Sequence, residues 1–224
     1  EAWIERHTEL HIPEVIHEAI EQIAVEARES DFVDKSSGVS ARMPISYLET
    51  VASAAEARAV AEGNDVAVVR ICDLFSAITA LTGKIELVYK GEQEGVANVA
   101  LHLAGRAIRH MFNSRIVPNY KRGRDRKADF TQFQEVIDWF EEGNQVRLTT
   151  EMSDDEYLKT LKDVGGLEKV TKELKISDDQ RDFPVMMEFV IEGLHQNFLL
   201  TKHIKDARIT YTDAVAYMMD ELTE

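Results

Sequence analysis

The stretch Ser36-Ser37-Gly38-Val39-Ser40-Ala41-Arg42 separates two helix-like segments of this chain. Residues 14–29 form an amphipathic pattern, and a second helix is indicated over residues 43–62 by Pro44 near its start and a Gly-Asn pair after its end. We therefore predict a helix on each side and a polar loop between them. Because Arg42 stands at the entrance of the second helix, the stretch marks where a helical bundle turns.

Arg42 is the first candidate for a functional residue. Its guanidinium presents a rigid fork of N–H donors that suits phosphate oxygens, and a helix entrance adds unpaired N–H groups and a positive dipole end. These properties indicate half of a nucleotide site. The other half is absent from this sequence, because the only Gly-Lys pair, Gly83-Lys84, is followed by Ile85 rather than by the Ser or Thr of a phosphate-binding loop. A plain surface role for Arg42 is the alternative.

The rest of the pattern is also mostly helical. Further helices are expected over residues 72–81, 93–116, 130–141, 153–164, up to 175, 178–201 and around 215–219, and short strands over 145–150 and 208–211. The pattern lapses between Gly83 and Gly95, which we take as the boundary between a first domain, residues 1–90, and a second, residues 91–224. The predicted class is mainly α, a helical bundle followed by an α-helical extension with at most one short β-hairpin.

Composition excludes several classes of function. The chain has 224 residues, 44% hydrophobic and 30% charged, as in a globular protein. Its formal net charge of −15 makes it a poor general binder of nucleic acid. No apolar run reaches membrane-spanning length, the first residues do not form a signal peptide, and the single Cys72 cannot form an internal disulfide. These features favour a cytoplasmic protein without a membrane partner.

Several stretches carry a resemblance to a known family. They are Ser37 to Arg42, the Ala-rich run 54–63, the helix start 70–74 and the run Gly83-Lys84-Ile85-Glu86-Leu87. Together they resemble the small helical lid domain of AAA+ ATPases, in the branch of the magnesium chelatase I subunit and the MoxR-like proteins. The resemblance is specific over residues 12–90. Beyond residue 90 it extends only to a long helical extension found in one bacterial subgroup of magnesium chelatase-like proteins.

The resemblance implies a role for the chain as the C-terminal part of a larger hydrolase. Residues 1–90 would be the lid, Arg42 would be the sensor 2 arginine that reaches the γ-phosphate of ATP, and Ser40 would lie beside it in the nucleotide site. The parent would use ATP and Mg²⁺ to remodel a partner protein or insert a metal. Its partners would be its own P-loop domain, neighbouring subunits of a ring, and a protein with a von Willebrand factor A-type domain. The fragment alone lacks the P-loop, so we expect it to hold no cofactor and to be inactive.

A second hypothesis needs no nucleotide. In it the chain is a stand-alone helical module that binds another protein, and Arg42 is incidental. The two hypotheses differ in whether a P-loop domain is encoded upstream of Glu1. The basic segment 121–127 is either a solvated loop or a contact for an acidic partner, since too few aromatic residues flank it for nucleic acid.

Other candidates are weaker. His7 and His11 have the spacing of two ligands on one helix, but the metalloprotease motif needs Glu directly after the first His, so we assign no metal site. Arg58 and Arg70 are interpreted as helix-surface residues, with a contact to a neighbouring ring subunit as the alternative. We identify no nucleophile paired with a base, and we interpret Cys72 as structural.

Overall fold

The computed structural model describes residues 8–36, 39–117, 128–175, 177–205 and 208–214, and these are mainly helical, as predicted. The α-helices are α1 (Glu14–Glu29), α2 (Met43–Glu62), α3 (Ile71–Ser76), α4 (Thr79–Thr82), α5 (Tyr89–Glu94), α6 (Val96–Arg115), α7 (Gln134–Glu141), α8 (Asp154–Lys162), α9 (Leu167–Leu174) and α10 (Phe183–Gln196). The strands are β1 (Glu9–His11), β2 (Val66–Val68), β3 (Val146–Thr149), β4 (Leu200–Lys205) and β5 (Arg208–Asp213). Two 3-10 turns, Thr131–Phe133 and Gln180–Asp182, precede α7 and α10.

The chain divides into two compact units. Unit 1 comprises Glu1–Ala104 with the short return segment Thr150–Ser153, and unit 2 comprises Gly105–Thr149 with Asp154–Glu224. The helix α6 begins in unit 1 and ends in unit 2. Whether residues 1–90 and 91–224 are an ATPase lid and its extension stays a prediction. No helix in the described part of the chain is long and apolar enough to cross a membrane.

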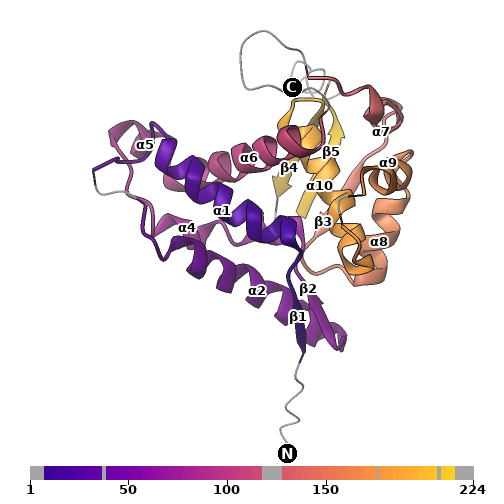
Figure 1. Cartoon of the computed structure of the whole chain (residues 1–224), viewed down its shortest axis with the longest axis horizontal. Helices are drawn as coiled ribbons and strands as arrows, with labels where there is room; N and C mark the ends of the chain where they lie inside the picture. Colours follow the sequence, from indigo (N-terminus) through magenta and orange to yellow (C-terminus); the bar gives the residue numbers. More distant parts are fainter. Residues whose placement is uncertain (1–7, 37–38, 118–127, 176, 206–207, 215–224) are drawn as a thin grey trace, which may run out of the picture. The chain divides into compact units, whose positions relative to one another are not determined.

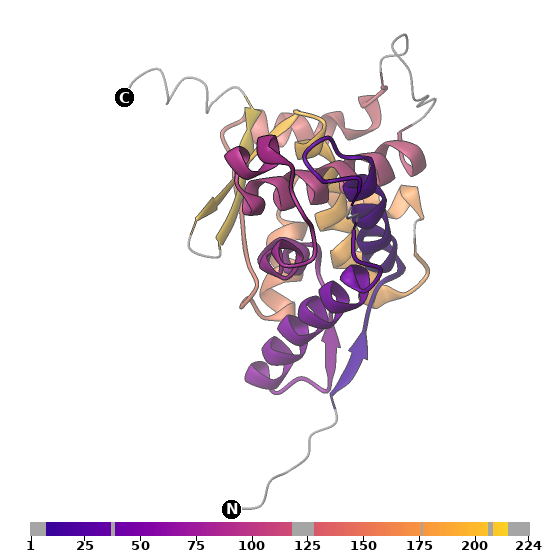
Figure 2. The same ribbon diagram turned by 90° about the vertical axis from the view of Figure 1, so that its left-hand side faces the viewer.

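Unit 1 is built on the two helices that the opening stretch separates. α1 packs against α2, and the parallel strands β1 and β2 lie side by side next to them (Figures 1 and 2). The buried positions of both helices follow a helical period, with Ile16, Ile23, Tyr47 and Val51 fully buried. α2 ends at Gly63, which has a φ of 76°, a conformation that glycine adopts without steric cost. The predicted bounds of both helices are confirmed.

Two other helices predicted in or next to this unit are interrupted. The pattern over 72–81 contains α3, a turn at Ala77 and Ile78, and α4 rather than one helix. The pattern over 93–116 contains the end of α5 and then α6, because Gly95 has a φ of 90° and breaks the helix between them. Apolar residues keep their helical spacing across both breaks, so the spacing alone does not show them.

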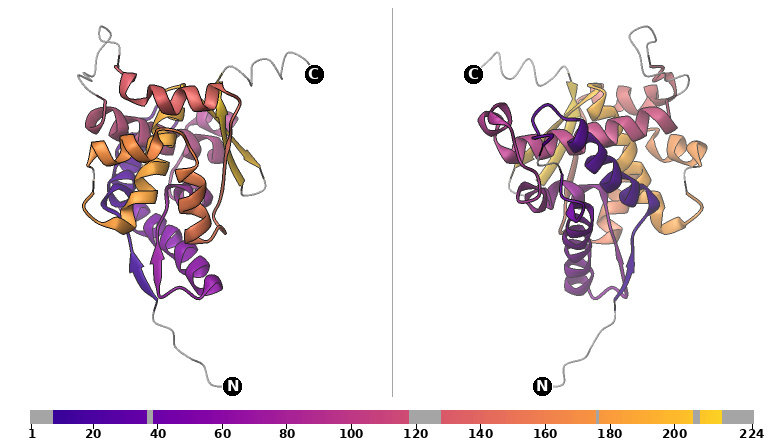
Figure 3. Two further views of the ribbon diagram at one scale, coloured as in Figure 1. Left: turned by 90° about the vertical axis from the view of Figure 1, so that its right-hand side faces the viewer. Right: turned by 60° about the vertical axis from the view of Figure 1, so that its left-hand side comes forward.

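Unit 2 surrounds the buried helix α10. α8, α9 and the sheet contact it, and Figure 3 shows them grouped around it. The sheet has the order β3-β5-β4 and is antiparallel, with Leu148 opposite Ile209 and Ile204 opposite Ile209 on the other side. α8 is held to α10 by Tyr157, whose hydroxyl lies 2.5 Å from a carboxylate oxygen of Glu188.

The sheet is larger than the single hairpin that we expected. β3 and β5 pair as predicted, but β4 occupies residues that begin inside the helix expected over 178–201. α10 ends earlier because Phe198 has a φ of 64° and turns the chain back toward β5. The expected helix around 215–219 and the basic segment 121–127 lie outside the described residues.

Candidate functional site

Arg42 lies where the sequence predicts it, immediately before the first residue of α2. Its side chain is exposed, and its carbonyl oxygen accepts the backbone N–H of Ser46 at 3.0 Å, so Arg42 starts the hydrogen bonding of the helix. Among the described residues, none forms an ion pair or a side-chain hydrogen bond with its guanidinium. Arg42 is thus an exposed residue with five N–H donors at the positive end of a 20-residue helix.

Ser40 sets the backbone of this entrance. Its hydroxyl oxygen accepts the backbone N–H of Arg42 at 3.3 Å, and its carbonyl oxygen accepts that of Met43 at 2.9 Å. Ser40 is exposed, and its hydroxyl retains one O–H donor. The structure therefore brings Ser40 and Arg42 together, with Ser40 shaping the turn that presents Arg42.

The loop before Arg42 is tied down on both sides of residues 37–38. Isolated β-bridges join Val33 to Leu87 and Val39 to Ile85, and the backbone N–H of Asp34 donates to the carbonyl of Glu86 at 2.8 Å. The segment after α4 thus holds the described parts of the loop. Of the four stretches that carry the family resemblance, the described part of the first, from Val39, and the last, 83–87, therefore lie side by side.

The first turns of α2 are anchored in the core. Met43 and Tyr47 are fully buried, and the Tyr47 hydroxyl donates to the carbonyl oxygen of Leu74 in α3. Burial raises the pKa of Tyr47 well above its ordinary value, so the phenol stays protonated as a donor. Arg42 is therefore an exposed cation on a rigid helix end rather than on a free loop.

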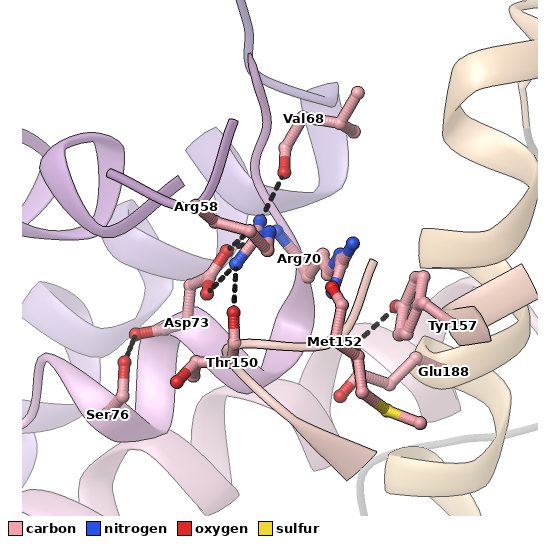
Figure 4. A network of polar contacts seen from close by, with 9 residues as sticks. All are labelled: Arg58, Val68, Arg70, Asp73, Ser76, Thr150, Met152, Tyr157 and Glu188. Atoms are coloured by element: carbon pink, nitrogen blue, oxygen red, sulfur yellow. Dashed lines mark hydrogen bonds and ion pairs between the residues drawn. The ribbon is translucent and has the colours of Figure 1, made fainter. Parts of the chain in front are cut away.

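Arg58 and Arg70 are not surface residues, and that interpretation was wrong. Arg58 is 7% exposed and Arg70 is 1% exposed. The guanidinium of Arg58 forms two hydrogen bonds with the carboxylate of Asp73, at 2.8 and 3.0 Å, and Asp73 is itself fully buried (Figure 4). Both arginines can be buried because carboxylate or carbonyl oxygens accept hydrogen bonds from their guanidiniums in place of water.

Backbone carbonyls complete this buried cluster. Arg58 donates to the carbonyl oxygens of Val68 and Thr150, at 2.7 and 2.9 Å, and Arg70 donates to that of Met152 at 2.8 Å (Figure 4). The backbone N–H of Arg70 also donates to Asp73 at 2.9 Å, which caps α3. The cluster therefore joins α2, the end of β2, α3 and the return segment of unit 1 into one body.

A second buried ionic cluster lies in unit 2, and sequence reasoning missed it. Glu192 in α10 is fully buried and accepts hydrogen bonds from Lys202 at 2.7 and 2.9 Å, Tyr211 at 2.6 Å and Gln196 at 2.7 Å. Burial raises the pKa of Glu192. Lys202, His195 and Tyr211 together lower this pKa by more than burial raises it, so the pKa lies below its ordinary value. The carboxylate is ionised and saturated with donors, which suits a brace between α10, β4 and β5.

Cys72 is buried in α3, consistent with a structural role. His11 lies in the strand β1 rather than on a helix, and His7 lies outside the described residues. Of the residues considered, Arg42 with Ser40 is the group that combines exposure, charge and a fixed backbone. Comparisons of the chain with protein-family models, with curated proteins and with solved structures give no match, so the case for this site is carried by its residues.

Proposed function

We propose that this chain is the helical lid and extension of a AAA+ ATPase that resembles magnesium chelatase subunit I and the MoxR-like proteins. The observation that supports this proposal most is the exposed side chain of Arg42 at the entrance of α2, a helix that is anchored in the core. This position at a helix entrance supports the role of sensor 2 arginine that the family resemblance implies for Arg42. Ser40 supports it by holding the backbone of the turn.

The chemistry needs a positioned cation. During phosphoryl transfer, negative charge is spread over the equatorial oxygens of the γ-phosphate, and catalysis is largely positioning and electrostatic stabilisation. A guanidinium that donates to those oxygens stabilises this charge, and the positive end of α2 adds to the same field. The P-loop domain of the parent would hold the nucleotide and Mg²⁺, and this chain would supply the cation from the other side.

The anchoring of α2 supports a mechanical role. Tyr47 binds the helix to α3 near its start, and Arg58 binds it to Asp73 further along. A phosphate that draws Arg42 toward it would therefore move α2 and α3 together as a rigid body. In the proposed parent, a cytoplasmic ring, that motion would pass the nucleotide state to neighbouring subunits and to a partner protein with a von Willebrand factor A-type domain.

The test is ATP hydrolysis by the full-length parent protein. We expect Arg42→Ala to lower kcat, measured at saturating ATP, by about 100-fold or more, the usual scale for one positioned donor. The affinity for ADP should be retained, and the affinity for ATP should fall by only about tenfold. Arg28→Ala is the matched control, because Arg28 is an exposed arginine of unit 1 at the end of α1. It should leave kcat unchanged.

Two results would contradict the proposal. One is equal activity of Arg42→Ala and Arg28→Ala. The other is a reading frame without a P-loop domain upstream of Glu1, which would favour the helical interaction module. ATP turnover by the purified fragment would refute the narrower expectation that it is inactive alone.

A further inference from the structure

The helix α10 ends in a turn whose left-handed residue is an exposed phenylalanine. The backbone N–H of Phe198 donates to the carbonyl oxygen of His195 at 2.9 Å, and that of Leu199 donates to the carbonyl oxygen of Leu194 at 3.1 Å. These two bonds define a Schellman turn, whose left-handed residue is usually glycine. Phe198 adopts it with a φ of 64°, so this residue carries a steric cost that glycine would avoid.

The described residues bury little of the Phe198 ring. The residue is 76% exposed, and its ring lies 5.2 Å from the guanidinium carbon of Arg109 in α6. In the described part of unit 2, one other large apolar side chain is exposed, that of Ile204 at 48%. A strained backbone persists where the surrounding structure compensates for it, which points to a contact that the described residues do not supply.

The chain leaves the described region close to this ring. Asp213, at the end of β5, pairs with Leu200 of β4, and Phe198 lies two residues before Leu200. Paired Cα atoms lie about 5.5 Å apart and two residues span at most about 7 Å, so the Cα atoms of Asp213 and Phe198 lie within about 13 Å of each other. Ile204 pairs instead with Ile209, further back along β5. Ile204 therefore lies at the other end of this strand pair.

The last ten residues of the chain have the sequence pattern of an amphipathic helix. Ala214, the last described residue, is already helical. Apolar side chains follow at the spacing of one helix face, at Val215, Met218, Met219 and Leu222. A helix of ten residues spans about 15 Å, which is enough to reach Phe198 from the end of β5. Its apolar side would need a surface to cover.

We propose that residues 215–224 form a helix whose apolar side covers Phe198. Met218 and Met219 would contact the ring, because thioether groups pack favourably against aromatic side chains. The segment is tethered at the end of β5, so its effective concentration at the ring is high. The net charge of −15 opposes the approach of a second copy of the chain or of an acidic partner, whereas docking of a tethered segment adds no charge. The contact does not depend on the proposed nucleotide site.

Disulfide trapping in the full chain tests this contact. Phe198→Cys is combined with Met218→Cys or Met219→Cys on the apolar side, and with Tyr217→Cys on the opposite side as the matched control. A disulfide needs Cα atoms within about 7 Å, and the native Cys72 is buried. We expect the faster of the two apolar-side pairs to close at least about tenfold faster than the Tyr217 pair. Equal rates on the two sides would overturn the proposal.

A second control tests the place of the contact. Ile204→Cys with Met219→Cys should close more slowly than Phe198→Cys with Met219→Cys, because Ile204 lies at the other end of the strand pair. Faster closure at Ile204 would move the segment to that end and refute the contact with Phe198.

A double-mutant cycle measures the same contact without cysteines. Phe198→Ala keeps a side chain in the left-handed turn and removes the ring. Its effect on Tm should be smaller by at least about 1 °C in a Met218→Ala, Met219→Ala background than in the wild type. Additive effects would contradict the contact.

The trapping experiment also identifies a different occupant. A disulfide between two chains in place of the intrachain one, seen as a dimer on a non-reducing gel, would assign the Phe198 ring to a second copy. That result would refute docking of the chain's own last residues.

Discussion

Removal of the Asp73 carboxylate should destabilise unit 1 strongly. Asp73 is fully buried and accepts three hydrogen bonds, two from the guanidinium of Arg58 and one from the backbone N–H of Arg70. In Asp73→Ala the Arg58 side chain, 4% exposed, keeps its charge and loses its counter-ion. The carbonyls of Val68 and Thr150 remain as acceptors but carry no net charge.

The expected cost follows from that uncompensated charge. Breaking a buried pair by removing one partner costs about 3–5 kcal/mol of unfolding free energy. For a chain of this size about 1 kcal/mol corresponds to roughly 2–4 °C in Tm, so Asp73→Ala should lower Tm by about 6–20 °C. Thermal unfolding followed by circular dichroism measures the shift.

A surface pair supplies the control. Lys35 and Asp31 form an ion pair at 3.3 Å, with side chains 64% and 88% exposed. Asp31→Ala should leave Tm within about 2 °C, because solvent screens exposed pairs. The double variant Arg58→Ala with Asp73→Ala should be clearly more stable than the sum of the two single losses predicts. A loss below about 1 kcal/mol in Asp73→Ala would refute the account of this cluster.

Two predictions concern unit 2. The pKa of Glu192 is lowered overall, so its ionisation contributes stability above about pH 4.3, the ordinary glutamate pKa, and that contribution disappears as the pH falls through the lower folded value. Urea unfolding should show a weaker loss of stability between about pH 5 and pH 3 in Glu192→Gln than in the wild type. A Cβ atom at Gly193 would overlap the ring of Phe112, so Gly193→Ala should cost at least about 1–3 kcal/mol, and an unchanged urea midpoint would contradict this packing.

The sequence predicts those elements whose ends are set by residues nearby in the chain. α1 has a helical apolar period, α2 has clear end signals in Pro44 and the Gly63-Asn64 pair, and the bounds of both helices are confirmed. β4 was missed because its strand begins inside a helical pattern, and only the left-handed Phe198 ends the helix there. Phenylalanine itself carries no turn signal, and the local mark of that end is the weaker one of Asn197 at the C-cap and His195 in the last turn.

The sequence likewise predicts one part of the candidate site and not the buried clusters around it. The position of Arg42 at a helix entrance follows from the spacing around it. The burial of Arg58 does not, because its acceptors Asp73 and Thr150 are 15 and 92 residues away. The Glu192 cluster was missed for the same reason, since its partners come from two strands whose pairing is set by the tertiary fold.

The central proposal is that Arg42 contacts the γ-phosphate of ATP bound to the proposed parent protein. Its most direct test is the affinity of the full-length parent, wild type and Arg42→Ala, for ATPγS and for ADP, measured by isothermal titration calorimetry. We expect the variant to bind ATPγS about tenfold more weakly, the loss of one charge-assisted contact, and to bind ADP as the wild type does. Equal affinities of the two proteins for ATPγS, or equal losses for both nucleotides, would contradict the claim.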